Sequence, residues 1–162
     1  MKHWTELENS SFFDANARER ALGMVDKGTF TEFLNPLDRY CSPHLPVLGT
    51  AVEFDDGTVC GVGLLGKHPV FVVSMEGKFI GGAIGEVNGG KMVATIRLAL
   101  KAAADIKAKY PEEYAARRPL VAVSFETGGV RLHEANAGLL AHAEVMDAFQ
   151  DCRGIVPVVA VV

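Results

Sequence analysis

Residues 121–134 read VAVSFETGGVRLHE, an apolar β-branched run that meets two glycines and then a helical pattern. Beyond the glycines, apolar side chains recur every three or four residues, at Leu132, Ala135, Leu139, Ala143, Met146 and Phe149. The pattern predicts a strand, a tight turn and a helix. Because glycine adopts positive φ and has no Cβ, a ligand atom can approach such a turn closely. The unpaired N–H groups that begin the helix could hold a negatively charged oxygen there. A glycine-rich turn that binds no ligand is the alternative.

A second glycine turn favours the functional interpretation. The sequence FIGGAIGEV at 79–87 follows the apolar run 70–73 and precedes another helical pattern. Its glycines lack the GxGxxG spacing of dinucleotide-binding turns, and the chain contains no GxxxxGKS/T motif. Two successive units therefore place a Gly-Gly turn between a strand and a helix, and the nucleotide-binding interpretations are excluded.

Four stretches carry a resemblance to a known family. The sequences FIGGAIGEV (79–87) and ETGGVRLHEANAGL (126–139), with 11–21 and 42–45 upstream, resemble the β subunit of biotin-independent malonate decarboxylase. This family is similar to the carboxyltransferase subunits of acetyl- and propionyl-CoA carboxylases, and all share the crotonase-like fold. The two glycine turns would fit any carboxyltransferase, whereas 126–139 narrows the match to the decarboxylase. His133 stands where the family pattern leads us to expect Gln.

The expected fold is α/β, a crotonase-like spiral of strand–strand–helix units. The core is expected over residues 49–162, with strands at 50–54, 58–65 and 70–75 and a hairpin turn at 55–57. Since the family's β subunit continues through further strand–helix units, we expect this chain to be truncated after about half the family's length.

Residues 1–48 are expected to form a helical arm and a loop. Ser10, Ser11 or Asp14 could cap a first helix that ends at Gly28. A short second helix should then begin at Thr29 or Thr31 and stop at Asn35-Pro36.

The resemblance implies a carbon–carbon lyase that decarboxylates malonyl-S-acyl carrier protein to acetyl-S-acyl carrier protein through an enolate. Backbone N–H groups would stabilise the enolate oxygen, and the expected donors are those of Gly128, Gly129 and Val130. Arg131 would either face the acyl carboxylate or form an ordinary ion pair. The facing thioester pocket is expected to be lined by Gly81, Gly82, Ala83 and Gly85.

The resemblance also implies partners and cofactors. The malonyl group would be attached to the CoA-like prosthetic group of an acyl carrier protein, and the reaction would use neither biotin nor a metal. A γ subunit of the same fold and an acyl-transferase α subunit complete the expected complex. Two alternatives stay open: a carboxyltransferase-type subunit that acts on another acyl-CoA, and a truncated, non-catalytic subunit that only pairs with partners. The isolated chain is expected to be inactive, because its sequence shows no convincing proton donor.

Composition agrees with a cytoplasmic protein, and the resemblance implies a bacterial one. The net charge of −4 gives no reason to expect a nucleic-acid partner, and no apolar run is long enough to span a membrane. The first residues, MKHWTE, lack the apolar stretch of a signal peptide. Three widely spaced cysteines suit a reducing compartment and argue against a disulfide framework or a zinc site.

Other polar residues receive structural interpretations. Ser124 lacks a GxSxG motif, and His133 and His142 are nine residues apart, unlike a zincin pair. His44 is expected to be a loop hydrogen-bonder rather than a catalytic base. Arg117 and Arg118, between prolines 111 and 119, are expected in a solvated loop, with contact to a phosphate-bearing carrier as the alternative.

Overall fold

The computed structural model describes residues 11–40, 42–45, 49 and 57–162. Within these residues the chain forms one mixed sheet in the order β1-β2-β3-β4-β5. The strands are β1 (Thr31–Phe33), β2 (Thr58–Leu65), β3 (His68–Met75), β4 (Leu120–Ser124) and β5 (Val158–Val161). The first three pair antiparallel, whereas β3, β4 and β5 pair parallel.

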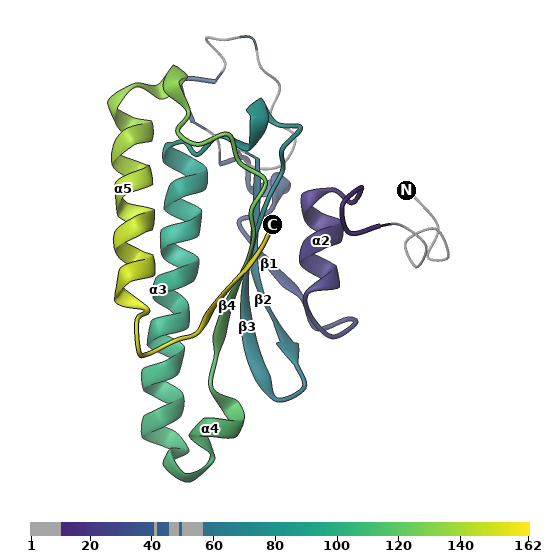
Figure 1. The fold of residues 1–162 in the computed structure, drawn as a ribbon, viewed down its shortest axis with the longest axis vertical. Coiled ribbons are helices and arrows are strands. Elements are labelled where there is room, and N and C mark those ends of the chain that lie inside the picture. The colour runs from purple at the N-terminus through teal and green to yellow at the C-terminus, as the bar shows by residue number, and fades with distance from the viewer. Residues whose placement is uncertain (1–10, 41, 46–48, 50–56) are drawn as a thin grey trace.

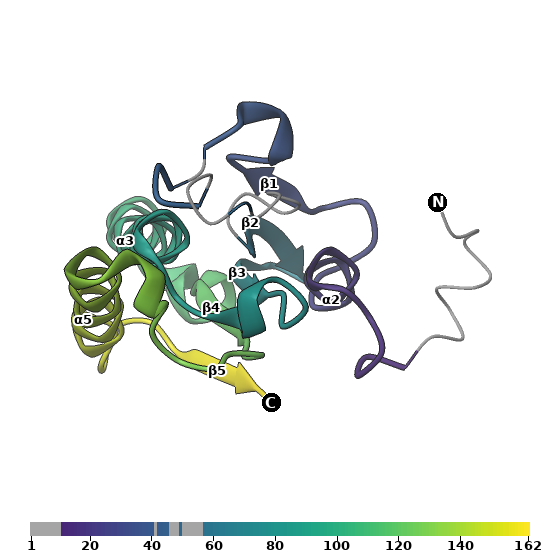
Figure 2. The ribbon, with the colours of Figure 1, turned by 90° about the horizontal axis from the view of Figure 1, so that it is seen from above.

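Helices cover both faces of this sheet (Figures 1 and 2). The long helices α3 (Glu86–Lys109) and α5 (Asn136–Asp151) lie side by side on one face, and α2 (Ala17–Gly23) lies on the other. Because successive strand residues point to opposite faces and helices cover both faces, the central strands β3 and β4 are mostly apolar. The α3 and α5 side buries Phe71, Val73, Met75, Val121 and Val123. The α2 side buries Val70, Val72 and Ala122.

The strands predicted at 58–65 and 70–75 are confirmed as β2 and β3. Both glycine turns follow strands as expected, and α3 begins within the predicted segment 79–87. The strand predicted at 50–54 lies outside the described residues, as do the first two residues of the expected hairpin turn.

The N-terminal prediction is partly wrong. The first helix of the described residues, α2, begins after Asn16 and ends at Gly23, well before Gly28. Asn16 and Glu19 form a capping box with two 2.9 Å hydrogen bonds, and this reciprocal cap sets the start of the helix. Glu76, the residue after β3, accepts a 2.9 Å hydrogen bond from the Ala17 N–H and so links α2 to the sheet.

The predicted second helix is a strand, β1, which pairs with β2. Gly61 of β2 explains this outcome, because a Cβ there would lie 2.4 Å from the Thr31 carbonyl oxygen. Only glycine lets the two backbones approach in this way. The segment expected to be an arm therefore adds a strand and a covering helix to the same sheet.

The expected loop at 110–119 is also partly helical, with η4 (Pro111–Glu113) and α4 (Tyr114–Arg117). Arg117 donates to Glu113 at 2.7 Å and its guanidinium lies 4.9 Å from the Tyr110 ring centroid. This segment precedes β4, so it lies at the opposite end of the sheet from the glycine turns (Figure 1). Arg117 is thus not placed beside those turns. Among the described residues, no helix has both the length and the apolar composition needed to cross a bilayer.

Candidate functional site

The two glycine turns meet at the carboxyl ends of the neighbouring parallel strands β3 and β4. The Gly128 N–H donates to the Gly81 carbonyl oxygen, and the Ile84 N–H to that of Gly129, each at 2.8 Å. A third 2.8 Å bond runs from the Arg131 N–H to the Ile84 carbonyl, which makes Ile84 and Val130 an isolated parallel bridge. The turns are therefore one cross-linked backbone unit at the edge where ligands bind in open α/β sheets.

Gly82 makes this close approach possible. Its φ is +67°, and a Cβ there would lie 1.7 Å from the carbonyl oxygen of Glu126. No other residue fits at this distance, and side chains also rarely adopt this φ. The turn η3 (Ile80–Gly82) is consequently held against the segment that follows β4.

The three expected oxyanion donors differ in their availability. The Gly128 N–H is already bonded to Gly81. The Gly129 N–H donates to the Thr127 hydroxyl at 3.1 Å, in an exposed position. Among the residues that the structure describes, the Val130 N–H has no acceptor. Of the three donors, Val130 is therefore the one without a partner in the described part of the chain, and the residue is partly exposed.

The expectation that these N–H groups begin a helix is wrong. The turn is followed by a short 3₁₀ segment, η5 (Leu132–Glu134), and α5 begins only at Asn136. Ala135, at φ +48°, redirects the chain between the two. The α5 dipole therefore does not start at the glycine turn, and any anion binding there depends on individual backbone donors.

Arg131 and Glu134 form a fully buried ion pair beneath the turns. Arg131 Nη1 lies 3.0 Å from Glu134 Oε1, and both side chains are 0% exposed. Arg131 Nη2 also donates to the Ala83 carbonyl at 2.9 Å, and the guanidinium lies 5.6 Å from the Phe79 ring centroid. Buried charges persist only when they are paired. Of the two roles left open for Arg131, the ion pair is present in this structure.

The start of α3 completes this framework. The Gly85 N–H donates to Asn88 Oδ1 at 2.6 Å, while Asn88 Nδ2 donates to the Ala83 carbonyl at 3.2 Å. Glu134 Oε2 accepts the Glu86 N–H at 2.5 Å, which satisfies a helix donor that would otherwise be unpaired. The structure thus brings Gly81, Gly82, Ala83 and Gly85 to one end of the sheet, where Ala83 and Gly85 take part in internal hydrogen bonds.

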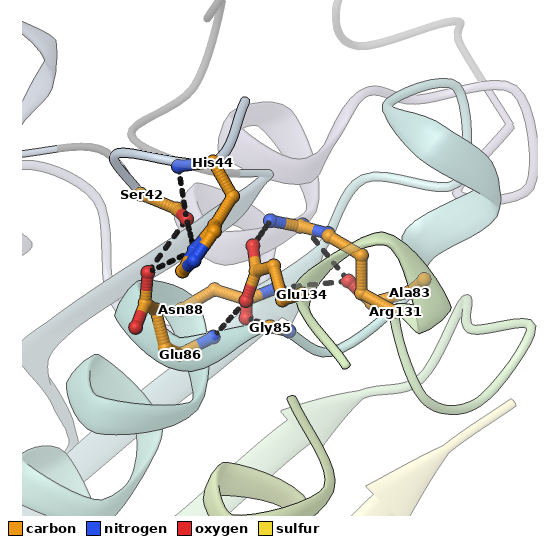
Figure 3. A network of polar contacts seen from close by, with 8 residues as sticks. All are labelled: Ser42, His44, Ala83, Gly85, Glu86, Asn88, Arg131 and Glu134. Carbon is orange, nitrogen blue, oxygen red and sulfur yellow. Dashed lines mark hydrogen bonds and ion pairs between the residues drawn. The ribbon is translucent and has the colours of Figure 1, made fainter. Parts of the chain in front are cut away.

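A second polar cluster, missed from the sequence, adjoins the first (Figure 3). Glu86 Oε1 accepts a 2.7 Å hydrogen bond from Ser42 Oγ and lies 3.0 Å from His44 Nδ1. His44 forms the hydrogen bonds that its loop position predicted. Glu86 was not singled out, although a carboxylate in the first turn of a helix is a recognisable favourable position. Its pairing with residues 42 and 44 has no local sequence signal.

Glu126 links the second turn to α2. Arg20 of α2 pairs with Glu126 Oε2, which also accepts the Gly77 N–H at 3.0 Å. Burial opposes ionisation of this carboxyl, but the hydrogen bonds and positive charge around it outweigh burial and lower the pKa of Glu126. Within the described residues, no group of three or more His, Cys, Asp or Glu side chains is arranged to hold a metal.

Comparisons with known proteins agree with this geometry. No protein-family model matches the chain. Over all 162 residues it is 60% identical to the malonyl-S-ACP:biotin-protein carboxyltransferase of Malonomonas rubra, of which it covers 51%. It is 29% identical to the propionyl-CoA carboxylase beta chain of Saccharopolyspora erythraea, over 90% of this chain and 24% of that protein.

Solved structures give the same result. A Pseudomonas malonate decarboxylase hetero-tetramer in complex with malonate matches with a TM-score of 0.81 and 37% identity, over 99% of this chain and 55% of that chain. The transcarboxylase 12S structure with methylmalonyl-coenzyme A bound matches with a TM-score of 0.74 and 26% identity, over 90% and 25%.

The structural neighbours of this chain thus form one class, the crotonase-fold carboxyltransferases and malonate decarboxylases. Within that class, the resemblance to malonate decarboxylase that the sequence motifs indicated is confirmed along the whole chain. The chain spans about half the length of the curated relative with 60% identity.

Proposed function

We propose that this chain forms part of a multisubunit carboxy-lyase that decarboxylates a malonyl thioester carried by an acyl carrier protein. The observation that carries the proposal is the Val130 N–H in the cross-linked glycine turns, which has no acceptor among the described residues. Loss of CO₂ breaks a carbon–carbon bond, and the electron pair moves into an enolate whose charge rests on the thioester oxygen. A fixed donor at that oxygen stabilises the transition state more than the ground state.

The rigidity of the turns supports this role. Three 2.8 Å backbone hydrogen bonds hold the segment around Val130, so its N–H needs no reorganisation during the reaction. One such donor is worth about 3–4 kcal/mol of transition-state stabilisation. The Gly129 N–H could add a second donor if an oxyanion displaced the exposed Thr127 hydroxyl.

Partners are part of the proposal. Two solved relatives are described as a hetero-tetramer and a hetero-dimer of Pseudomonas malonate decarboxylase. By analogy, a γ subunit of the same fold would complete the site, an acyl-transferase α subunit would load the carrier, and the carrier's CoA-like arm would present the malonyl group. The cytoplasmic location stays a prediction.

A second candidate function has specific support. The 60%-identical relative is described as a carboxyltransferase between malonyl-S-ACP and a biotin protein. The same enolate chemistry would then pass the carboxyl group to biotin instead of releasing CO₂. Other relatives are described as propionyl-CoA carboxylase and methylmalonyl-CoA decarboxylase subunits, which keeps another acyl-CoA substrate as an alternative.

The test uses the gene product in the complex that it forms with its partner subunits. Malonyl and methylmalonyl thioesters would be supplied, and the acetyl or propionyl product and released CO₂ would be measured with and without avidin, which sequesters biotin. Avidin-insensitive production of acetyl thioester supports direct decarboxylation. Avidin-sensitive production supports carboxyl transfer to biotin. A complex that consumes neither thioester would support the non-catalytic alternative and exclude both functions.

A further inference from the structure

The cluster of Ser42, His44 and Glu86 lies at the start of α3, beside the glycine turns, and the proposed chemistry so far assigns it no role (Figure 3). Glu86 Oε1 is shared by two partners, Ser42 Oγ at 2.7 Å and His44 Nδ1 at 3.0 Å. Ser42 Oγ also lies 3.3 Å from His44 Nδ1 and accepts the His44 backbone N–H at 3.2 Å. The imidazole is therefore fixed at one nitrogen by a carboxylate and a buried serine.

The other imidazole nitrogen is in a different situation. Among the described residues, His44 Nε2 has no hydrogen-bond partner, and the side chain is 49% exposed. A histidine whose Nδ1 is oriented by a carboxylate while Nε2 stays accessible is arranged to transfer a proton at Nε2. A cap that only tied the 42–45 segment to α3 would not require an accessible imidazole, since Ser42 already makes that link.

The cluster is linked by hydrogen bonds to the buried framework that supports the glycine turns. The backbone N–H of Glu86 donates to Glu134 Oε2 at 2.5 Å, and Glu134 pairs with Arg131, the residue after Val130. Among the described residues, the charged groups that these contacts link to His44 are Glu86 directly and, one contact further, the paired Glu134 and Arg131. Glu86 is the carboxylate that would balance a positive imidazolium.

We propose that His44 is the acid that protonates the enolate carbon and that Glu86 and Ser42 are its positioning residues. This inference rests on the proposed function. After CO₂ has left, the carbanionic carbon takes the proton from Nε2 of the imidazolium, and a carbon–hydrogen bond forms. The ring is left neutral with its Nδ1–H on Glu86, and solvent returns the proton to Nε2 at the exposed edge.

The test compares three single variants in the assembled complex, with malonyl-CoA as the probe. His44→Gln should lower kcat about a hundredfold with KM little changed, because general acids contribute about 10²–10⁴-fold. Glu86→Gln should lower kcat less. The double variant should be no slower than His44→Gln, since Glu86 acts through His44. His68→Gln is the matched control, because His68 Nδ1 contacts the Arg118 carbonyl at the other end of the sheet.

The pH profile separates catalysis from folding. His44→Gln should change the shape of the wild-type pH–rate profile by removing its alkaline limb, and it should regain part of its rate when imidazole is added. The proposal is overturned if His44→Gln keeps the limb and the wild-type rate, or if losses from His44→Gln and Glu86→Gln simply multiply in the double variant. If the wild-type complex consumes neither malonyl-CoA nor the malonyl thioester of its carrier protein, the proposed function itself fails. If His44→Gln does not assemble, an unchanged kcat in Glu86→Gln overturns the positioning role.

Discussion

Substitution of Val130 by Pro tests the oxyanion donor directly, because it removes the backbone N–H and nothing else that forms a hydrogen bond. In the structure this N–H has no acceptor among the described residues, whereas the flanking bonds at Ile84 and Arg131 do not involve it. Val130 does not have a positive φ, so the negative φ that proline requires is compatible with the backbone at this position. The same change at Gly129, where φ is +104°, would distort the turn.

The expected effect follows from the number of donors removed. Loss of one oxyanion donor costs about 3–4 kcal/mol, which corresponds to about a 10²–10³-fold fall in kcat. Decarboxylation of a malonyl thioester by the assembled complex is the assay, with a thermal melt to verify folding. Val130→Ala keeps the N–H and should lose less than tenfold. A folded, assembled Val130→Pro complex with a kcat within a few-fold of wild type would refute the assignment of this donor.

Three further predictions concern the framework of the site. Gly82→Ala would place a Cβ 1.7 Å from the Glu126 carbonyl oxygen, so it should lower the free energy of unfolding by about 2 kcal/mol or more and reduce turnover. Denaturant melts measure the first effect and the decarboxylation assay measures the second. In Arg131→Lys the lysine cannot form the planar contacts that Arg131 makes with Glu134 and Ala83, so the melting temperature should fall while kcat per folded complex changes little. A rise in KM without a fall in melting temperature would instead support the role in which Arg131 faces the substrate carboxylate. The lowered pKa of Glu126 means that its pairing with Arg20 stabilises the fold above the ordinary glutamate pKa of 4.5 and that this stability is lost as pH falls through the lower folded value. Denaturant melts between pH 6 and pH 3 should therefore show a shallower pH dependence in Glu126→Gln, and an unchanged dependence would contradict the pairing.

Local patterns predicted those elements whose cause is local. The strands β2 and β3 and the two turns depend on β-branched runs and on glycines, which act within a few residues. The motifs at 79–87 and 126–139 were sufficient to identify the class, which the whole-chain similarity confirmed. The secondary-structure predictions were wrong where a residue distant in the sequence determines the local structure. Residues 31–33 form a strand because Gly61, about thirty residues away, has no side chain and so leaves room for their backbone to pair with the edge of β2.

The sequence by itself determined the class of fold, the order of its central elements and the two turns that carry the candidate donors. Only the tertiary structure decided which donor is unpaired, because the Gly128 N–H is taken by a carbonyl 47 positions earlier, on the other turn. It also decided that Arg131 is buried against Glu134 and that Glu86 meets His44, 42 residues apart. These contacts arise where the carboxyl ends of parallel strands bring separate loops together, and no short-range pattern records which polar groups will meet there.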